Sequence, residues 1–480
     1  MRRIVYLLAL GLVWAVLGGC PPSLPPPNDG GMTTGGGAGG GSSQFFTYVD
    51  LDTHAVNTQY IAVATDLSQD RIGVAYYVDT KVTVPSAVQI DAGLHDGTDN
   101  WEVHYLEWKA GQISGQSTLR VVQRPVGISV AFQPNGEPVV AYLGGDGQDL
   151  TGMSRYWFQS DPEISVRSGG STWTQYVSNA KMSSDLQGGD TQSLDQIGMC
   201  ASGPDGVGFV LGLWPAIAYD STGKLYWAFR DVHSGQFPQQ DWGASDLKVV
   251  SGTGLPPSSP EWCVKAGGDD KGSWGGQNQM AIGAGDLPAI AFTTEPLGPD
   301  NDGNSIFFTR LQSNGNWTDI QQITTSPDVQ TGPGFAYDST EGYGIAWVDH
   351  SAQSQLFYTH SATGDHNTWQ TPTPIFGSGT GGWFPSLAMD PMHHEPAVSF
   401  YICSDASGKS EGSCTQDDEL DIIQRISGNW RQITVDTFGS VAALDNPNRV
   451  ISKVGFFSTG KRFVVYRLPQ GDTLRLAVEK

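Results

Sequence analysis

Aromatic side chains and carboxylates recur along this chain in a pattern that suits recognition of sugars. Tryptophans stand just before repeated apolar segments, and aspartates follow the paired segments. An aromatic plane packs on the apolar face of a sugar ring, and a carboxylate accepts hydrogen bonds from its hydroxyls; a protein ligand is also compatible, and the tryptophans could instead pack between repeats. The candidate ligand-binding residues are Trp214, Trp274, Trp383, Asp146, Asp231, Asp349 and Asp405.

A second group of residues has the ligand types of a calcium loop. Asp300, Asp302 and Asn304 place oxygen ligands at alternate positions, although the intervening glycine is misplaced for an EF-hand and no distal Glu follows. The alternatives are bound calcium and a solvated turn; no other cofactor is expected. The chain shows no catalytic motif, so we expect a non-catalytic binding module. The alternative is a glycoside hydrolase or lyase acting on polysaccharide.

The element that must position these residues is a repeated hairpin, clearest in LWPAIAYDSTGKLYWAFRD at 213–231. Two short apolar segments flank an Asp-Ser-Thr-Gly turn, which is typical of a β-hairpin. Repetition of such a unit at a period above fifty residues predicts a propeller or solenoid. A small residue marks the first strand of each copy: Ala64, Ala131, Ala218, Ala284, Ala336, Ala388 and Gly455.

Seven copies, each with four strands, predict an all-β, seven-bladed β-propeller of antiparallel blades over residues 44–480. The last copy lacks a fourth strand after 473–478, whereas QFFTYVDL at 44–51 is a surplus strand. We therefore expect the N-terminal strand to close the ring, since closure removes exposed sheet edges. The alternative is a six-bladed ring with an additional hairpin.

Turns such as SNGNW at 313–317 and SGNW at 427–430 resemble degenerate Asp-box turns of sialidase-like propellers. The resemblance covers 44–480 as architecture and implies no activity, because the Asp of that motif is missing. A sialidase-like site would also need three arginines and a Tyr-Glu pair, which the sequence does not supply.

The N-terminus has the features of a targeting segment. Two arginines precede an apolar stretch that ends in Leu-Gly-Gly-Cys20, which resembles a bacterial lipobox. The resemblance implies a signal peptide over 1–19 and lipidation of Cys20; the alternative is an ordinary secretory signal. The Pro- and Gly-rich stretch that continues to 43 is typical of a disordered tether. We expect a protein of the cell envelope that is lipid-anchored, in the outer membrane of a diderm bacterium, facing either side.

Composition limits the partners. A net charge of −23 repels phosphate backbones, which argues against nucleic acid. A glycan or an envelope protein remains as partner, contact with the membrane is expected through the lipid anchor only, and the chain is expected to be a monomer. An exported chain with four further cysteines predicts disulfides, for which we pair Cys200 with Cys263 and Cys403 with Cys414.

Overall fold

A computed structural model describes most of the propeller region. The described residues are 44–58, 60–83, 99–122, 125–144, 162–177, 211–231, 245–255, 257, 259–265, 273–295, 305–324, 332–349, 355–361, 368–376, 381–402, 418–439, 451–469 and 472–480. They contain strands and turns but no helix, and hence no helix long and apolar enough to cross a membrane. The expected signal peptide, lipidated Cys20 and tether lie outside these residues.

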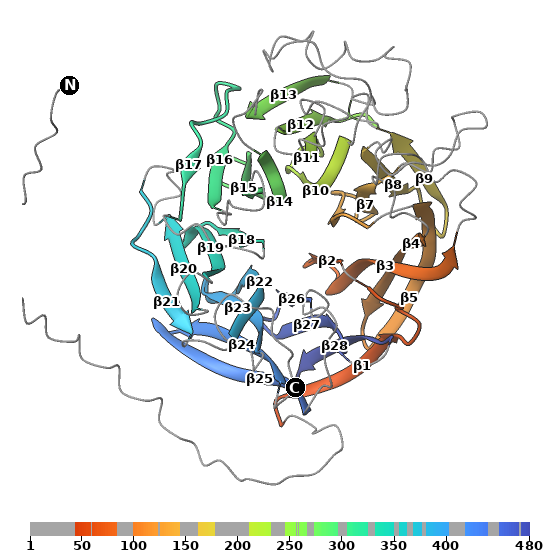
Figure 1. The fold of residues 1–480 in the computed structure, drawn as a ribbon, viewed down its shortest axis with the longest axis vertical. Coiled ribbons are helices and arrows are strands. Elements are labelled where there is room, and N and C mark those ends of the chain that lie inside the picture. Colours follow the sequence, from red (N-terminus) through yellow and green to blue (C-terminus); the bar gives the residue numbers. More distant parts are fainter. Residues whose placement is uncertain are drawn as a thin grey trace, which may run out of the picture. The chain divides into compact units, whose positions relative to one another are not determined.

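The described strands form seven antiparallel sheets of four strands each, arranged as blades around a central axis (Figure 1). The first three blades follow in chain order, and each begins with its innermost strand. The first blade has β2 (Ile61–Asp66), β3 (Arg71–Thr83), β4 (Asp99–Lys109) and β5 (Gln112–Val122). The second has β6 (Ile128–Phe132), β7 (Pro138–Leu143), β8 (Pro162–Arg167) and β9 (Trp173–Val177). The third has β10 (Leu211–Tyr219), β11 (Leu225–Asp231), β12 (Asp246–Gly252) and β13 (Ser259–Lys265).

The remaining blades repeat this order. The fourth has β14 (Ser273–Ile282), β15 (Pro288–Glu295), β16 (Ile306–Arg310) and β17 (Gln321–Gln322). The fifth has β18 (Gly334–Asp338), β19 (Gly342–Asp349), β20 (Gln355–Ser361) and β21 (Thr373–Phe376). The sixth has β22 (Gly381–Met389), β23 (Pro396–Ile402), β24 (Asp418–Ile426) and β25 (Asn429–Gly439). The seventh has β26 (Ser452–Phe456), β27 (Arg462–Arg467), β28 (Leu474–Glu479) and the N-terminal β1 (Phe46–Asp52).

The N-terminal strand closes the ring, as the sequence predicts. Strand β1 pairs antiparallel with β28 from Phe46 opposite Glu479 to Asp52 opposite Leu474. The Lys480 amide donates to the Phe45 carbonyl at 3.0 Å, which extends the pairing to the last residue. The C-terminal blade is thereby completed by the start of the domain, and the prediction of seven blades is confirmed.

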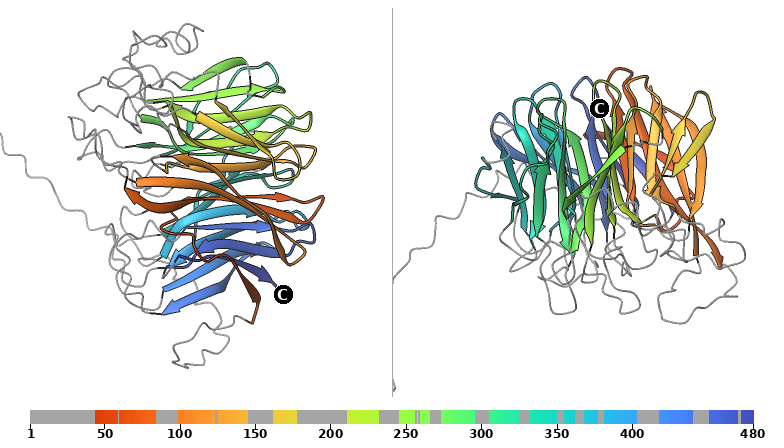
Figure 2. Two further views of the ribbon diagram at one scale, coloured as in Figure 1. Left: turned by 90° about the vertical axis from the view of Figure 1, so that its right-hand side faces the viewer. Right: turned by 90° about the horizontal axis from the view of Figure 1, so that it is seen from above.

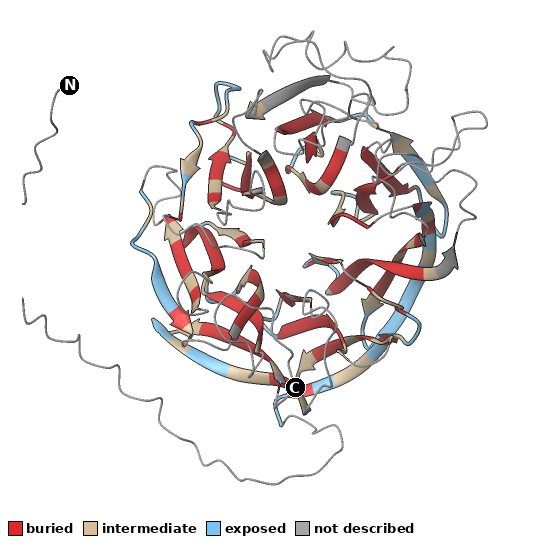
Figure 3. Ribbon diagram, in the orientation of Figure 1, coloured by how far each residue is buried: buried red, intermediate tan, exposed pale blue. Residues whose placement is uncertain are grey.

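The core lies between the blades, because each sheet buries its faces against the two neighbouring sheets. Burial is strongest on the middle strands: every residue of β7, β11 and β27 is buried. The outermost strands carry most of the exposed positions, as β5 and β25 illustrate (Figure 3). Strands of all blades run between the two faces of the ring, and short turns link first to second strands (Figure 2). A rigid frame of this kind can hold side chains precisely at its axis.

The register corrects one member of the small-residue series. In the fourth blade the turn begins at Gly283, whose amide donates to the Leu287 carbonyl just as that of Asp220 donates to Lys224 in the third blade. The residue two places before the turn is therefore Ala281, paired with Ala289. Ala284, predicted for this place, lies within the turn itself. The sequence alignment placed the start of the turn at the Gly-Asp pair at 285–286. In the structure the turn begins earlier, so the predicted small residue was three positions too late.

Candidate functional site

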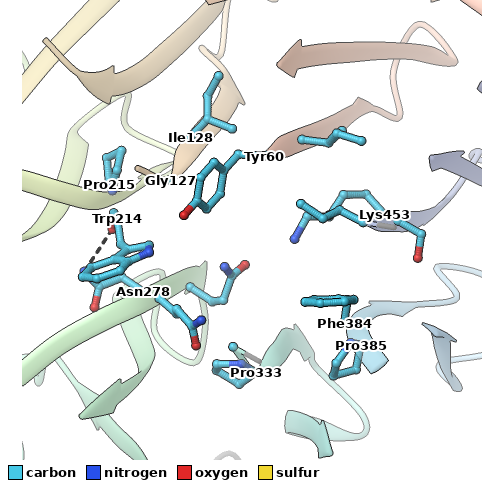
Figure 4. A pocket seen from close by; sticks show the side chains of 16 residues that line it. Tyr60, Gly127, Ile128, Trp214, Pro215, Asn278, Pro333, Phe384, Pro385 and Lys453 are labelled. Carbon is cyan, nitrogen blue, oxygen red and sulfur yellow. Dashed lines mark hydrogen bonds between the residues drawn. The ribbon is translucent and has the colours of Figure 1, made fainter. Parts of the chain in front are cut away.

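The innermost strands surround a pocket of about 350 Å³ on the axis of the ring. All seven blades contribute to it, from the beginning of each first strand or the residues just before it (Figure 4). Its volume falls in the range of small-molecule sites in proteins. The lining residues are Tyr60, Ile61, Gly127, Ile128, Trp214, Pro215, Gln277, Asn278, Gln279, Gly332, Pro333, Phe384, Pro385, Ile451, Ser452 and Lys453.

Three blades line this pocket with a bulge in the first strand. In the third blade the pairing with β11 jumps from Leu213 to Ala216, so that Trp214 and Pro215 have no opposite residue. The same jump leaves Gln277–Asn278 unpaired in β14 and Phe384–Pro385 unpaired in β22. A bulge bends a strand and re-aims side chains, and bulges are frequent beside functional sites. We call these three residue pairs the first-strand bulges.

The first residue of each first-strand bulge has an unusual backbone. Trp214, Gln277 and Phe384 have φ of 46°, 48° and 54°, in the left-handed region that L-residues avoid. Two of the three also precede a proline, which normally keeps its predecessor extended. Local strain of this kind costs on the order of 1–3 kcal/mol per residue and persists where the surrounding structure imposes it, often at ligand sites.

A glycine two residues before the first residue of each first-strand bulge makes the bulge possible. Gly212, Gly275 and Gly382 have φ of 104°, 84° and 96°. A Cβ on Gly212 would lie 2.7 Å from the Pro162 Cα of the preceding blade, closer than real Cβ atoms approach backbone. Glycine is therefore required there both for its dihedral angle and for the approach of two blades.

Contacts with neighbouring residues fix the Trp214 side chain. The Trp214 backbone amide donates to the Val126 carbonyl at 3.2 Å, and the Arg230 guanidinium lies 5.2 Å from the centroid of the indole ring. Arg230 is itself 1% exposed, and its Nε donates to Ser245 Oγ at 2.7 Å. A cation held against an indole face is a favourable contact when both are desolvated. The indole is thus a preorganised aromatic wall of the pocket.

Asn278 is the polar partner of this wall. Its side chain is 3% exposed, and Nδ2 donates to the Trp214 carbonyl at 3.0 Å (Figure 4). Oδ1 has no hydrogen-bond partner among the residues that the structure describes. Because Oδ1 is itself buried from solvent, this amide supports the Trp214 wall from behind and does not face the cavity.

Lys453 supplies the charge of the pocket. Its side chain, from β26, points toward the centre of the cavity in Figure 4, and it is the single charged residue of the lining. Burial lowers the pKa of Lys453 to about 8. The residue is half-buried, because its stem packs among the inner strands while the amine faces the cavity.

The three predicted tryptophans have different surroundings. Trp214 lines the pocket, whereas Trp383 is 2% exposed and buried beside Phe384, which lines the pocket in its blade. Trp274 packs edge-on against Phe307, with ring centroids 5.0 Å apart, and its amide donates to the Ser245 carbonyl. The packing alternative therefore describes Trp274 and Trp383 in this structure.

The predicted aspartates do not gather at the pocket. Asp231 is fully buried and forms an ion pair with Lys248, which also lies 4.0 Å from Asp246. Asp349 ends β19 opposite Gln355 and is half-buried. Asp146 and Asp405 lie outside the described residues, as do most of the long loops between blades.

The other predicted sites fall largely outside the described residues. This holds for the calcium candidates Asp300, Asp302 and Asn304, and for Cys200, Cys403 and Cys414. Cys263 lies in β13, opposite Lys248. Within the described ranges no three His, Cys, Asp or Glu residues are grouped so as to hold a metal ion. The calcium site and both disulfides remain predictions.

Sequence reasoning missed Phe384, Gln277, Asn278 and Lys453, although the chain contains signals for some of them. An X-Pro pair precedes the first-strand motif in three blades, in WPAIAYD, GPGFAYD and FPSLAMD. The place of Lys453, two residues before Gly455, is filled in the other blades by small or uncharged side chains: Ala62, Ser129, Ala216, Gln279, Gly334 and Ser386. A lysine in that series is the exception.

No family model matches the chain, and no curated protein matches it. Solved structures with a similar arrangement include a protein of unknown function from Dyadobacter fermentans DSM 18053, at 10% identity and a TM-score of 0.43, covering 76% of this chain and 95% of that one. A GH93 α-L-arabinofuranosidase of Fusarium graminearum, in complex with arabinobiose, has 10% identity and a TM-score of 0.45, with 76% and 93% covered. A Trypanosoma rangeli sialidase mutant with trans-sialidase activity has 11% identity and a TM-score of 0.41, with 78% and 56% covered. Likeness at this level carries no inference about activity.

Proposed function

We propose that this protein is a non-catalytic carbohydrate-binding module that takes a sugar residue into the axial pocket. The observation that carries the proposal is the pair of first-strand bulges that hold Trp214 and Phe384 at the pocket in a strained left-handed conformation. Strain that serves no packing role is expected where a ligand contributes the compensating energy.

The polar groups of the pocket are also suited to a sugar. The amides of Gln277 and Gln279 offer donors and acceptors at the pocket. Aromatic planes with a small number of placed polar groups are the usual composition of such sites. A peptide side chain would meet the same surfaces, and protein binding is an outcome that the experiment below can reveal.

Hydrolysis receives less support from this pocket. Glycoside hydrolases normally use two carboxyl groups on either side of the bond that is cleaved. The described lining contains neither Asp nor Glu. These residues therefore support binding rather than cleavage.

The experiment is a saccharide array followed by calorimetry with the best ligand. Trp214→Asn removes the indole but places there a residue that tolerates positive φ, so the bulge is kept. We expect this variant to lose at least about tenfold in affinity, in line with the worth of an aromatic contact. Trp317→Ala, which removes a half-buried tryptophan away from the pocket, is the matched control and should bind as the wild type does.

Two results would refute the assignment. One is unchanged binding by a folded Trp214→Asn variant. The other is release of reducing sugar by the wild type during incubation with its ligand, which would favour the hydrolase. A wild type that binds no saccharide but does bind an envelope protein would replace the glycan with a protein ligand.

We also propose that Cys20 anchors the protein to a membrane through lipid. The support is the apolar leader that ends in Leu-Gly-Gly-Cys. Mass spectrometry of the mature protein should find acylated Cys20, and Cys20→Ala should move the protein to the soluble fraction. A wild type that begins elsewhere and carries no acyl chain would exclude this.

A further inference from the structure

We propose that the axial pocket selects an acidic sugar residue, whose carboxylate or sulfate group pairs with the Lys453 amine. This inference rests on the proposed function and specifies its ligand class. Two separate observations support it: the position of the lysine at the axis, and a pocket lining whose described residues include uncharged amides and aromatic rings but neither Asp nor Glu.

The charge of Lys453 is not needed for packing of the inner strands. In the six other blades the equivalent place holds a small or uncharged residue, and in two of these it is a serine that accepts from the next blade. Ser129 Oγ accepts from the Ile217 amide at 3.1 Å, and Ser386 Oγ accepts from the Val454 amide at 3.3 Å. Lys453 instead directs its amine into the cavity (Figure 4). This exceptional lysine therefore lies in the lining of the axial pocket.

No carboxylate opposes this amine among the described residues. Of the strands packed against β26, neither β22 nor β23 carries a charged side chain. Strand β2 carries Asp66 at its far end, in an ion pair with Arg71. On β27, Arg462 pairs with Glu479 and Arg467 lies 4.0 Å from Asp472. The other titratable residue of the lining is Tyr60.

The charge of the pocket is therefore opposite in sign to the net charge of the protein. The protein carries a net charge of −23, which on its own repels anions. A lone ammonium in a partly enclosed pocket attracts one anionic group at short range, because the low local dielectric strengthens the pair. In this arrangement Lys453 pairs with the acid group, the sugar ring lies on Trp214, and the amides of Gln277 and Gln279 bond its hydroxyls.

The lysine also makes this selectivity depend on pH. Because burial lowers the pKa of Lys453 to about 8, the amine is charged at neutral pH and neutral in mildly alkaline solution. An acid group stays ionised over this range. The preference for an acidic sugar is therefore present below about pH 8 and lost above it.

The test uses methyl glycosides in matched sets, with galactose, glucose and mannose each as the neutral sugar, the uronate and the 6-sulfate. Calorimetry at pH 6.5 should show that the wild type prefers an acidic member of one set by about tenfold or more. The uronate and sulfate arms show which acid group is bound. Lys453→Met should abolish this preference, so that the acidic and neutral members of the set bind with equal affinity. Lys461→Met, which removes an exposed lysine from a turn of the same blade, should change neither affinity.

A conservative variant keeps the test decisive if Lys453→Met unfolds. Lys453→Arg retains a charge that does not titrate in this range, so its preference should persist at pH 9.5, where that of the wild type has disappeared. Equal binding of neutral and acidic sugars by the wild type would overturn this inference and leave the proposed function standing. A preference for the acidic sugar that persists in Lys453→Met would overturn the inference in the same way. Failure of every saccharide to bind would overturn both.

Discussion

Trp214 and Phe384 are equivalent residues of the third and sixth blades: each has a positive φ, each precedes a proline, and each lines the axial pocket. The neighbours of the two residues are also equivalent, since Leu213 and Trp383 are the last paired residues before each bulge. The tryptophan thus lines the axial pocket in the third blade and is buried in the sixth, because the two tryptophans differ by one position of register.

Adjacent residues of the sixth blade should therefore respond in opposite ways. Trp383→Ala should lower the free energy of unfolding by about 3–5 kcal/mol, because it empties a buried site, and leave ligand affinity unchanged in the folded fraction. Phe384→Asn should weaken sugar binding with little loss of stability. Urea denaturation and calorimetry on both variants separate the two effects; reversed outcomes would place the wrong residue at the pocket.

The ring closure should depend on Phe46. This residue is 1% exposed and packs with Leu420, Ile422 and Val435 of the sixth blade. Phe46→Ala should cost about 3–5 kcal/mol of stability, whereas Thr47→Ala, at the next and exposed position, should stay within about 0.5 kcal/mol. Deletion of 44–51 should lower the melting temperature further and promote association through the uncovered β28 edge. A deletion variant that melts as the wild type does would show that closure adds no stability.

A buried ion network should couple the first two blades. Glu107 accepts from Arg71 at 3.3 Å and pairs with Arg167 at 2.7 Å, and all three are less than 10% exposed. Glu107→Gln removes one carboxylate from these two guanidinium groups, although Arg71 keeps Asp66 and Arg167 keeps Glu137, and should destabilise the fold by about 1.5–3 kcal/mol. Asp50→Asn, which breaks the more exposed pair with Arg475, should cost less than about 1 kcal/mol. Equal effects of the two changes would contradict this description.

Asp421 should make stability depend on acidity. It is fully buried in β24, and burial raises its pKa to about 6, despite hydrogen bonds from Gln432 and Thr434. A raised folded-state pKa means that its contribution to stability is fully present below about pH 4 and is lost as the pH rises through about 6. Asp421→Asn should therefore stabilise the protein by about 2 kcal/mol at pH 7.5 and by little at pH 4. Thermal melts at both pH values check this, and a gain of equal size at both would contradict it.

The sequence predicts the architecture well because a propeller repeats one local pattern. Turn residues and alternating apolar strands identify the blades, and the strand surplus at 44–51 identifies the closure. The first-strand bulges are harder to predict, because a bulge is a property of the pairing between two strands and not of either strand alone. That is why Trp383 looked like the counterpart of Trp214, when register gives that place to Phe384.

Lys453 shows a different limit of sequence reasoning. In isolation KVGFF is an ordinary strand, and the lysine stands out only when all seven blades are aligned on the observed register. The error at Ala284 would have obscured this comparison, because it displaces the fourth blade by three residues. Asn278 required the structure itself, since its role depends on a hydrogen bond to the Trp214 carbonyl in the neighbouring blade.

The most direct test of the central claim is a crystal structure of the protein with the saccharide that binds best. The account predicts a sugar ring in the axial pocket, lying against the Trp214 indole with its hydroxyls bonded to the amides of Gln277 and Gln279. A ligand bound between blades or on the outer strands, with the axial pocket free of sugar, would contradict it.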